Sequence, residues 1–277
     1  MMILRNSLYN TFPKVFHCMG PKKWKKYGLR FFNTYINYLK TISDCKSKSD
    51  LITYLFVDTH KDRVSPLELS LNKFGFRYIK IGEGKSYTHD ARTPWVMEAL
   101  DSVKTPYVMG LDSYDCVVMD SPEHIVSVFK ENFNCRMVYN TEMLSFPPNK
   151  ELYDFETSVN DYPYAFVNAG AWISETDFYK EVLEFNNAQV PRIKGSDQEI
   201  NRLAHKHFYP DIQADDHCHI FQTACATGKW GFDKVFGGRK KPKDLLRLAE
   251  YLPHNGYYVR IENTAGPYWD LTLLSDK

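Results

Sequence analysis

The chain has 277 residues, of which 43% are hydrophobic and 25% are charged, with 35 Lys and Arg against 34 Asp and Glu. This composition is typical of a globular protein and excludes the collagen-like, disordered and coiled-coil classes. The formal net charge of +1 gives no overall reason to expect a nucleic-acid partner or binding to a membrane surface.

No membrane segment or signal peptide is expected from the sequence. A membrane helix needs about 18 consecutive apolar residues, and no window of the chain provides them. Arg5 and Asn10 interrupt the first apolar stretch, which argues against a signal peptide. The six cysteines are widely spaced and include no CxxC pair, which favours reduced thiols. We therefore expect a cytoplasmic protein without an integral membrane segment.

The predicted elements begin after the polar residues 43–50. We expect residues 1–50 to form an N-terminal extension and residues 51–277 to form one domain. Short runs of β-branched and aromatic residues follow, with the pattern of buried parallel strands. Three such runs lie at residues 51–57, 76–81 and 107–111.

Two helical stretches separate these strands. They lie at residues 67–74, where Gly75 ends the helix, and at residues 94–103. Because strands and helices alternate at this spacing, the sequence predicts an α/β fold with a mostly parallel central sheet flanked by helices.

The second half of the chain is less regular. We expect strands at residues 135–139 and 165–173, and helices at residues 177–186 and 196–205. Ser196 and Glu199 have the spacing of a capping box, which indicates where the last of these helices begins.

Polar residues follow two of the predicted strands directly. Asp58 comes after the strand at 51–57, and Asp112 comes after the strand at 107–111. In open parallel sheets, ligands bind beyond the carboxyl ends of the strands, so both residues indicate the same rim. Asp112 and Asp115 can converge on one divalent cation, which would supply the positive charge that a diphosphate leaving group needs. Turn or cap carboxylates have the same pattern.

Residues 112–115, Asp-Ser-Tyr-Asp, resemble the DxxD metal motif of GT-A type glycosyltransferases. This form of the motif is similar to that in the glycosyltransferase domain of the procollagen lysyl hydroxylase and glucosyltransferase family. Further segments that resemble this family follow in the same order along residues 51–256. They are Thr141-Glu142, Phe146-Pro147, Tyr162-Pro163-Tyr164 with residues 167–173, Asp197-Gln198, Asp216-His217 with residues 220–222, and His254-Asn255-Gly256. The resemblance implies a GT-A, Rossmann-like nucleotide-diphospho-sugar transferase fold.

The resemblance also implies a metal site and a nucleotide site. Asp112, Asp115 and His254 would hold Mn²⁺, with Mg²⁺ as the alternative, because one histidine beside two carboxylates suits Mn²⁺. The ring of Tyr114 would stack on the uracil of a UDP-sugar. Thr59, at the end of the first strand of the domain, would also reach the uridine.

Five more residues are implied to act on the phosphates, the sugar and the acceptor. Arg92 would pair with the donor phosphates. Asn168 and Gly170 would lie near the sugar, where glycine allows close approach of the backbone. Asp197 would contact the donor sugar hydroxyls or the reacting centre, and Glu142 would lie on the acceptor side.

The chain departs from the family pattern around the sugar and the acceptor. The aspartate-rich run of the family is reduced to Asp197, and the LNSGG segment is replaced by Val-Asn-Ala-Gly-Ala at residues 167–171. The CWP segment becomes Ser-Phe-Pro at residues 145–147. No residues match the double-histidine iron site of the hydroxylase part of that family, so no hydroxylase activity is expected.

Together these features predict a Mn²⁺-dependent transferase that moves glucose or galactose from a UDP-sugar to a hydroxyl acceptor. The acceptor that the resemblance suggests is hydroxylysine or galactosyl-hydroxylysine of a collagen-like protein, and a glycan or another small acceptor is equally compatible. One alternative is a catalytically inactive module of the same fold that binds nucleotide sugars or glycans. A sugar nucleotidyltransferase is disfavoured because residues 57–62 lack a glycine-rich signature, and a metal-dependent hydrolase using DxxD would need no nucleotide.

Overall fold

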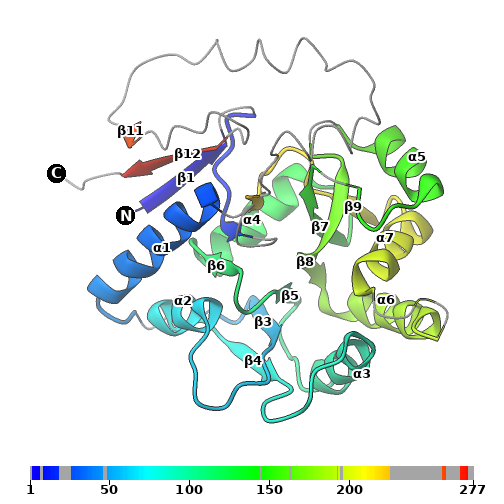
Figure 1. Cartoon of the computed structure of the whole chain (residues 1–277), viewed down its shortest axis with the longest axis horizontal. Helices are drawn as coiled ribbons and strands as arrows, with labels where there is room; N and C mark the ends of the chain where they lie inside the picture. The colour runs from blue at the N-terminus through cyan, green and yellow to red at the C-terminus, as the bar shows by residue number, and fades with distance from the viewer. Residues whose placement is uncertain are drawn as a thin grey trace.

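A six-stranded sheet with the order β4-β3-β5-β8-β7-β9 forms the centre of the computed structural model (Figure 1). The structure describes residues 2–6, 9–18, 26–45, 49–143, 145–161, 164–191, 193, 196–224, 258–259 and 269–273. The strands of this sheet are β3 (Ile52–Val57), β4 (Tyr78–Ile81), β5 (Tyr107–Leu111), β7 (Met137–Glu142), β8 (Phe166–Glu175) and β9 (Ile212–Ala214). Only β8 runs antiparallel to its neighbours. The predicted mostly parallel sheet is confirmed.

Helices cover both faces of this sheet (Figure 1). The helices are α2 (Pro66–Phe74) and α4 (Pro122–Asn132) on one face, and α3 (His89–Leu100), α6 (Thr176–Gln189) and α7 (Asp197–Phe208) on the other. Alternate residues of β3 divide between the two cores, as the period of a strand requires. Tyr54 packs with α2 and α4, whereas Leu55 packs with α3 and α6. Because the sheet is buried on both faces, the sequences of its central strands are continuous apolar runs.

A second, three-stranded sheet has the order β10-β2-β6. Its strands are β2 (Val15–His17), β6 (Cys116–Val118) and β10 (Phe221–Thr223). The middle strand, β2, comes from the segment expected to be an N-terminal extension, and it joins residues that lie about 100 and about 200 positions further along the chain. Helix α1 (Lys26–Thr41) packs over this sheet, where Tyr35 contacts the core around Phe16. The N-terminal segment therefore contributes to the same folded body.

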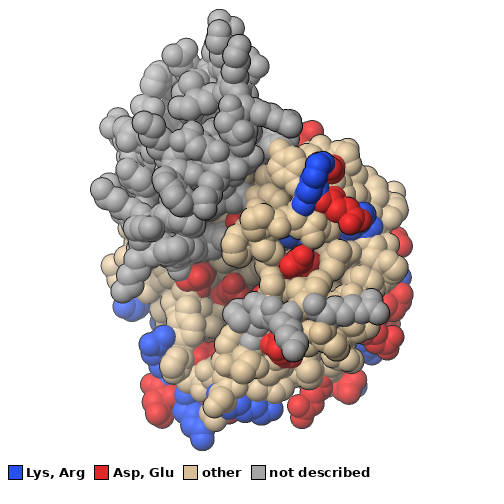
Figure 2. Space-filling model, turned by 45° about the vertical axis from the view of Figure 1, so that its right-hand side comes forward, with Lys and Arg blue, Asp and Glu red and all other residues tan. Residues whose placement is uncertain are grey.

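Two smaller elements complete the described structure. Helix α5 (Lys150–Val159) packs beside β8, where the ring of Tyr153 stacks on that of Phe166. A third sheet, of order β1-β12-β11, contains β1 (Met2–Asn6), β11 (Tyr258–Val259) and β12 (Trp269–Leu273). None of the helices in the described part of the chain has the length and apolar character that crossing a bilayer requires. Basic and acidic side chains are interspersed over the described surface shown in Figure 2.

Helix boundaries follow from local capping. Helix α2 begins after Ser65, whose side chain accepts a hydrogen bond from the Glu68 amide, and it ends at Gly75 with a φ of 67°. Helix α7 begins after Ser196, whose hydroxyl accepts from the Glu199 amide, as the predicted capping box requires. The start of α7 and the end of α2 at Gly75 were both predicted, because each signal lies within one turn of the residues it stabilises.

Helix α3 differs from the prediction that it spans residues 94–103. It begins at His89, because the side chain of Thr88 caps it by accepting a hydrogen bond from the amide of Ala91. Pro94 therefore lies inside the helix, although proline is most favoured in a first turn. The earlier start places Arg92 on the helix and directs it toward the end of β5.

Candidate active site

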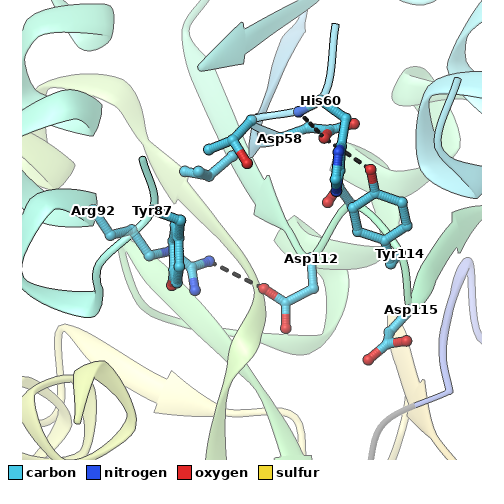
Figure 3. Close-up of a pocket in the computed structure, with 10 residues that line it drawn as sticks. Asp58, His60, Tyr87, Arg92, Asp112, Tyr114 and Asp115 are labelled. Atoms are coloured by element: carbon cyan, nitrogen blue, oxygen red, sulfur yellow. Dashed lines mark hydrogen bonds and ion pairs between the residues drawn. The ribbon is translucent and has the colours of Figure 1, made fainter. Parts of the chain in front are cut away.

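A cavity of about 320 Å³ lies at the carboxyl ends of β3 and β5. Its lining residues are Val57, Asp58, Thr59, His60, Tyr87, Arg92, Asp112, Ser113, Tyr114 and Asp115. Figure 3 shows Arg92 and Tyr87 on one side, Tyr114 and His60 on the other, and Asp112 between them. Asp58 and Asp112 thus share one rim of the sheet, as the strand pattern predicts.

The loop after β5 holds both aspartates of the DxxD segment. The amide of Asp112 donates a hydrogen bond to the carbonyl of Gly170 at 2.8 Å, and the amide of Cys116 donates to the carbonyl of Asp112 at 3.1 Å. The tight turn between these two bonds directs the carboxylates of Asp112 and Asp115 to the same side of the loop (Figure 3). Carboxylate oxygens are the ligands that Mg²⁺ and Mn²⁺ prefer.

A bulge in β8 brings bare backbone against Asp112. The register with β7 changes from Tyr139 opposite Trp172 to Asn140 opposite Asn168, so residues 169–171 bulge toward β5. A Cβ atom on Gly170 would lie 2.6 Å from Asp112 Oδ2 and would also collide with the imidazole of His17. The carboxylate therefore occupies a space that only glycine leaves open.

Arg92 links Asp112, which lines the cavity, to Asp197, which does not. Its Nη2 donates to Asp112 Oδ1 at 3.2 Å, and its Nη1 donates to Asp197 Oδ2 at 2.7 Å. Burial acts to lower the pKa of Arg92, but the two carboxylates more than offset this and raise it above its ordinary value. The guanidinium is a permanent positive charge beside Asp112, where it can receive an anionic group.

The aromatic ring of Tyr114 forms the opposite wall of the cavity. The hydroxyl of Tyr114 donates to Asp58 Oδ1 at 2.9 Å, and the same oxygen accepts from the amide of His60 at 3.0 Å. The guanidinium of Arg63 lies 4.4 Å from the centroid of the Tyr114 ring. Asp58 is buried, so its hydrogen bond to the Tyr114 hydroxyl fixes the orientation of the ring. A planar base can stack on such a ring either opposite Arg63 or in its place.

Behind the loop of residues 112–115 lies a buried network of amide and carboxyl groups. Glu142 Oε1 accepts hydrogen bonds from Asn168 Nδ2 at 3.0 Å and from Gln198 Nε2 at 3.1 Å. Asn168 Oδ1 in turn accepts from the amide of Gly170 at 2.9 Å. Burial raises the pKa of Glu142 to about 8, so this carboxyl is mostly protonated at neutral pH. It is only 2% exposed, and its contacts hold Asn168 and Gln198.

Substituting Glu142 with glutamine should change how stability depends on pH. The folded-state pKa of about 8 lies above the unfolded value of about 4.3. The unfolded chain therefore loses this proton first, and the free energy of unfolding falls by up to about 1.4 kcal/mol per pH unit between these values. Glu142→Gln removes that contribution. Urea unfolding of both proteins between pH 5 and 8 should show the variant gaining relative to wild type as pH rises, and a constant difference would contradict the assignment.

The structure brings most of the sequence-predicted site residues to one place. Thr59, Arg92, Tyr114, Asp112 and Asp115 line the cavity. The remaining predicted residues of the described chain do not line the cavity but contact residues near it. Asp197 pairs with Arg92, and Gly170 packs against Asp112. Asn168 is hydrogen-bonded to Glu142. His254, the predicted third metal ligand, lies outside the described residues.

Within the described residues, a different group of side chains is close enough to hold an ion together. It consists of Asp161, Asp216 and His217. These three already pair with one another, because His217 Nδ1 lies 2.9 Å from Asp216 Oδ1 and its Nε2 lies 3.5 Å from Asp161 Oδ2. Asp161 is exposed and the other two are half-buried, and exposed acidic groups are common without an ion.

The sequence interpretation missed His17, which lies beside Asp112. Its Nε2 is 3.7 Å from Asp112 Oδ2. No local pattern indicates this residue, because β2 has only three residues and pairs with distant segments. Pairing over such separations leaves no periodicity in the sequence near the strand.

Comparison with known proteins identifies the class of the domain. The model of the PLOD GT domain family matches residues 57–227, more than half of the chain. Fold and family together define a GT-A type glycosyltransferase domain. The chain belongs to the family of PLOD glycosyltransferase domains, which confirms the resemblance seen in the sequence.

Solved structures include a further similar protein. It is a glycosyltransferase involved in the glycosylation of the major capsid of PBCV-1, with 14% sequence identity and a TM-score of 0.38. The similarity covers 68% of this chain and 88% of that chain. No curated protein matches the chain.

Proposed function

We propose that this chain is a Mn²⁺-dependent hexosyltransferase that moves glucose or galactose from a UDP-sugar to a hydroxyl acceptor. The observation that most supports this proposal is the cavity at the ends of β3 and β5, which is lined by Asp112, Asp115, Arg92 and Tyr114 among other residues. Such a cavity in a glycosyltransferase fold suits an anionic donor with a planar base.

The residues present fit a hard divalent cation. Asp112 and Asp115 offer carboxylate oxygens from one tight turn, and Gly170 leaves room for the first of them. His254 stays the proposed third ligand. When bound, the ion would neutralise the charge that develops on the departing diphosphate.

The remaining cavity residues fit the donor. Arg92 presents a guanidinium, which can pair with phosphate oxygens in a bidentate manner, and Asp197 would accept hydrogen bonds from sugar hydroxyls. Tyr114 and Thr59 would contact the nucleoside. Most of the catalysis would come from position and charge, as the transferred sugar gains positive character at its anomeric carbon.

The acceptor side is proposed to lie beyond the carboxyl end of β7. The loop there exposes 62% of Phe146. Arg202 holds this loop by donating to the carbonyl of Pro147 at 2.7 Å and to the hydroxyl of Ser145 at 2.8 Å. An exposed aromatic ring can stack on a sugar or a peptide. The proposed acceptor is hydroxylysine or galactosyl-hydroxylysine of a collagen-like protein, or a glycan. Glu142 would act here by holding Asn168 and Gln198 in place.

A donor screen on the full chain tests this function. UDP-glucose, UDP-galactose, UDP-N-acetylglucosamine and GDP-mannose are each incubated with Mn²⁺ or with EDTA, and thermal stability and nucleotide release are measured. We expect stabilisation and UDP release with UDP-glucose or UDP-galactose only when Mn²⁺ is present, because a ligand of the folded state raises its stability. Stabilisation without release would favour the inactive binding module or a transferase that lacks its acceptor in the assay, and no response to any nucleotide would refute the proposal.

Substituting Arg92 with glutamine should weaken donor binding without weakening metal binding. Loss of charge-assisted hydrogen bonds to phosphate, worth about 1.5–3 kcal/mol, should raise the KM for the donor by about 10- to 100-fold. Free Mn²⁺ should bind the variant at least as tightly as wild type, because a cation 3.2 Å from Asp112 is removed. Arg136→Gln, which alters a half-exposed pair with Glu175, is the matched control. An unchanged donor KM in Arg92→Gln would contradict the phosphate role.

A further inference from the structure

His17 is a buried histidine at the edge of the proposed metal site. It lies in β2, outside the residues 57–227 that match the family model, and it is 2% exposed. Its imidazole packs against the backbone of Gly170, with Nε2 3.7 Å from Asp112 Oδ2. The chemistry of this ring depends on which of its nitrogens carries the proton.

The side chain of Asn140 fixes that proton. Thr223 Oγ1 donates a hydrogen bond to Asn140 Oδ1 at 2.9 Å, so the amide nitrogen of Asn140 faces the opposite way. This nitrogen lies 3.0 Å from His17 Nδ1 and 3.5 Å from Asn168 Oδ1. Because an amide nitrogen only donates, His17 Nδ1 accepts.

The neighbouring network disfavours the reversed amide orientation. It would place Asn140 Oδ1 against Asn168 Oδ1, which already accepts a hydrogen bond from the amide of Gly170. Two oxygens without a proton between them repel. The neutral ring of His17 therefore carries its proton on Nε2, the nitrogen that faces Asp112.

We propose that His17 is a positioning residue for the metal site, which directs its Nε2–H toward Asp112 Oδ2 while Arg92 holds Oδ1. The 3.7 Å separation exceeds a direct hydrogen bond, and a movement of about 0.5 Å closes it. His17 does not ligate the ion, because its Nε2 carries a proton and has no free lone pair. The inference rests on the proposed function, in which Asp112 holds Mn²⁺, and it makes β2 part of the metal site.

Substitution of His17 tests this role through metal affinity. The dissociation constant of Mn²⁺ is measured on the full chain from the signal of free Mn²⁺ in electron paramagnetic resonance, without donor. His17→Leu should weaken binding by about 10- to 100-fold, as expected for the loss of an outer partner of a ligand. His17→Gln should retain an affinity close to wild type, because its amide N–H replaces the imidazole Nε2–H.

A second measurement determines the tautomer of His17 directly and does not depend on metal binding. Proton–nitrogen correlation spectra of the full wild-type chain report the tautomer of each histidine, and the His17 signals are assigned by their absence in His17→Gln. We expect the proton on Nε2 and a lone pair on Nδ1.

The outcomes separate the two proposals. Wild-type affinity in His17→Leu, or a proton on Nδ1, would overturn the role of His17 while leaving the proposed function intact. Failure of the wild-type chain to bind Mn²⁺ would overturn both. Weaker binding in His17→Leu that is not restored in His17→Gln, with the proton on Nδ1, would also count against positioning by Nε2–H.

Discussion

Replacing Asp112 with asparagine should remove Mn²⁺ binding and UDP release together. The substitution keeps the size of the side chain against Gly170 but removes the charge that a hard cation requires. Mutation of a residue that only hydrogen-bonds to a metal ligand costs about 10- to 100-fold in metal affinity or activity. Loss of a ligand itself should therefore cost more than about 100-fold. Mn²⁺ titration and a UDP-release assay at saturating donor measure both effects.

Asp154→Asn is the matched control for this prediction. Asp154 lies on α5 and pairs with Lys150 on the surface, away from the cavity. The Asp154→Asn variant should bind Mn²⁺ and release UDP as the wild-type chain does. Retained Mn²⁺-dependent turnover in Asp112→Asn would mean that the metal binds elsewhere or that the reaction needs none, and the proposed function would fail.

Replacing Arg202 with methionine should cause the largest loss of stability. Arg202 Nη2 lies 2.5 Å from Glu156 Oε2, and both side chains are fully buried. Glu156 also accepts a hydrogen bond from the amide of Val167 at 3.0 Å. Removing one partner leaves an uncompensated buried charge, which costs about 3–5 kcal/mol. Urea denaturation at pH 7 measures the change in the free energy of unfolding.

The chain contains a matched pair on the same two helices. Lys206 of α7 pairs with Glu151 of α5 at the surface, where Glu151 is 76% exposed. Lys206→Met should cost less than about 1 kcal/mol, because surface ion pairs are screened by water. Adding Glu156→Gln to Arg202→Met should recover part of the loss, since it removes the uncompensated charge. Equal effects of Arg202→Met and Lys206→Met would contradict the buried-pair assignment.

The sequence was sufficient for the first three strands of the central sheet, β3, β4 and β5, and for the position of Asp112 and Asp115 after β5. The strands β3 and β5 are apolar and short, and each is followed directly by an aspartate, so their burial and direction follow from local pattern. Asp112 and Asp115 follow from the same pattern, because a polar loop after a buried strand lies at the rim of the sheet.

Contacts between distant segments could not be predicted in this way. Arg92 and Asp197 were both expected near the donor, but their ion pair across 105 positions depends on how α3 and α7 are placed. The pairing of Asn140 with Asn168, beside Glu142, depends on the bulge of β8, which shifts the register of β7 and β8 between Tyr139 and Asn140. The position of His17 beside Asp112 depends on the pairing of β2 with β6 and β10. Local periodicity carries no information on any of these three arrangements.

The position of manganese is the most direct test of the proposed site. Crystals of the full chain grown with UDP and Mn²⁺ would locate the ion by its anomalous scattering. We predict a peak bound by Asp112 and Asp115, in the cavity lined by Arg92 and Tyr114. A peak at Asp161, Asp216 and His217 instead, or no peak in the cavity with UDP bound there, would contradict a manganese-dependent transferase site at the end of β5.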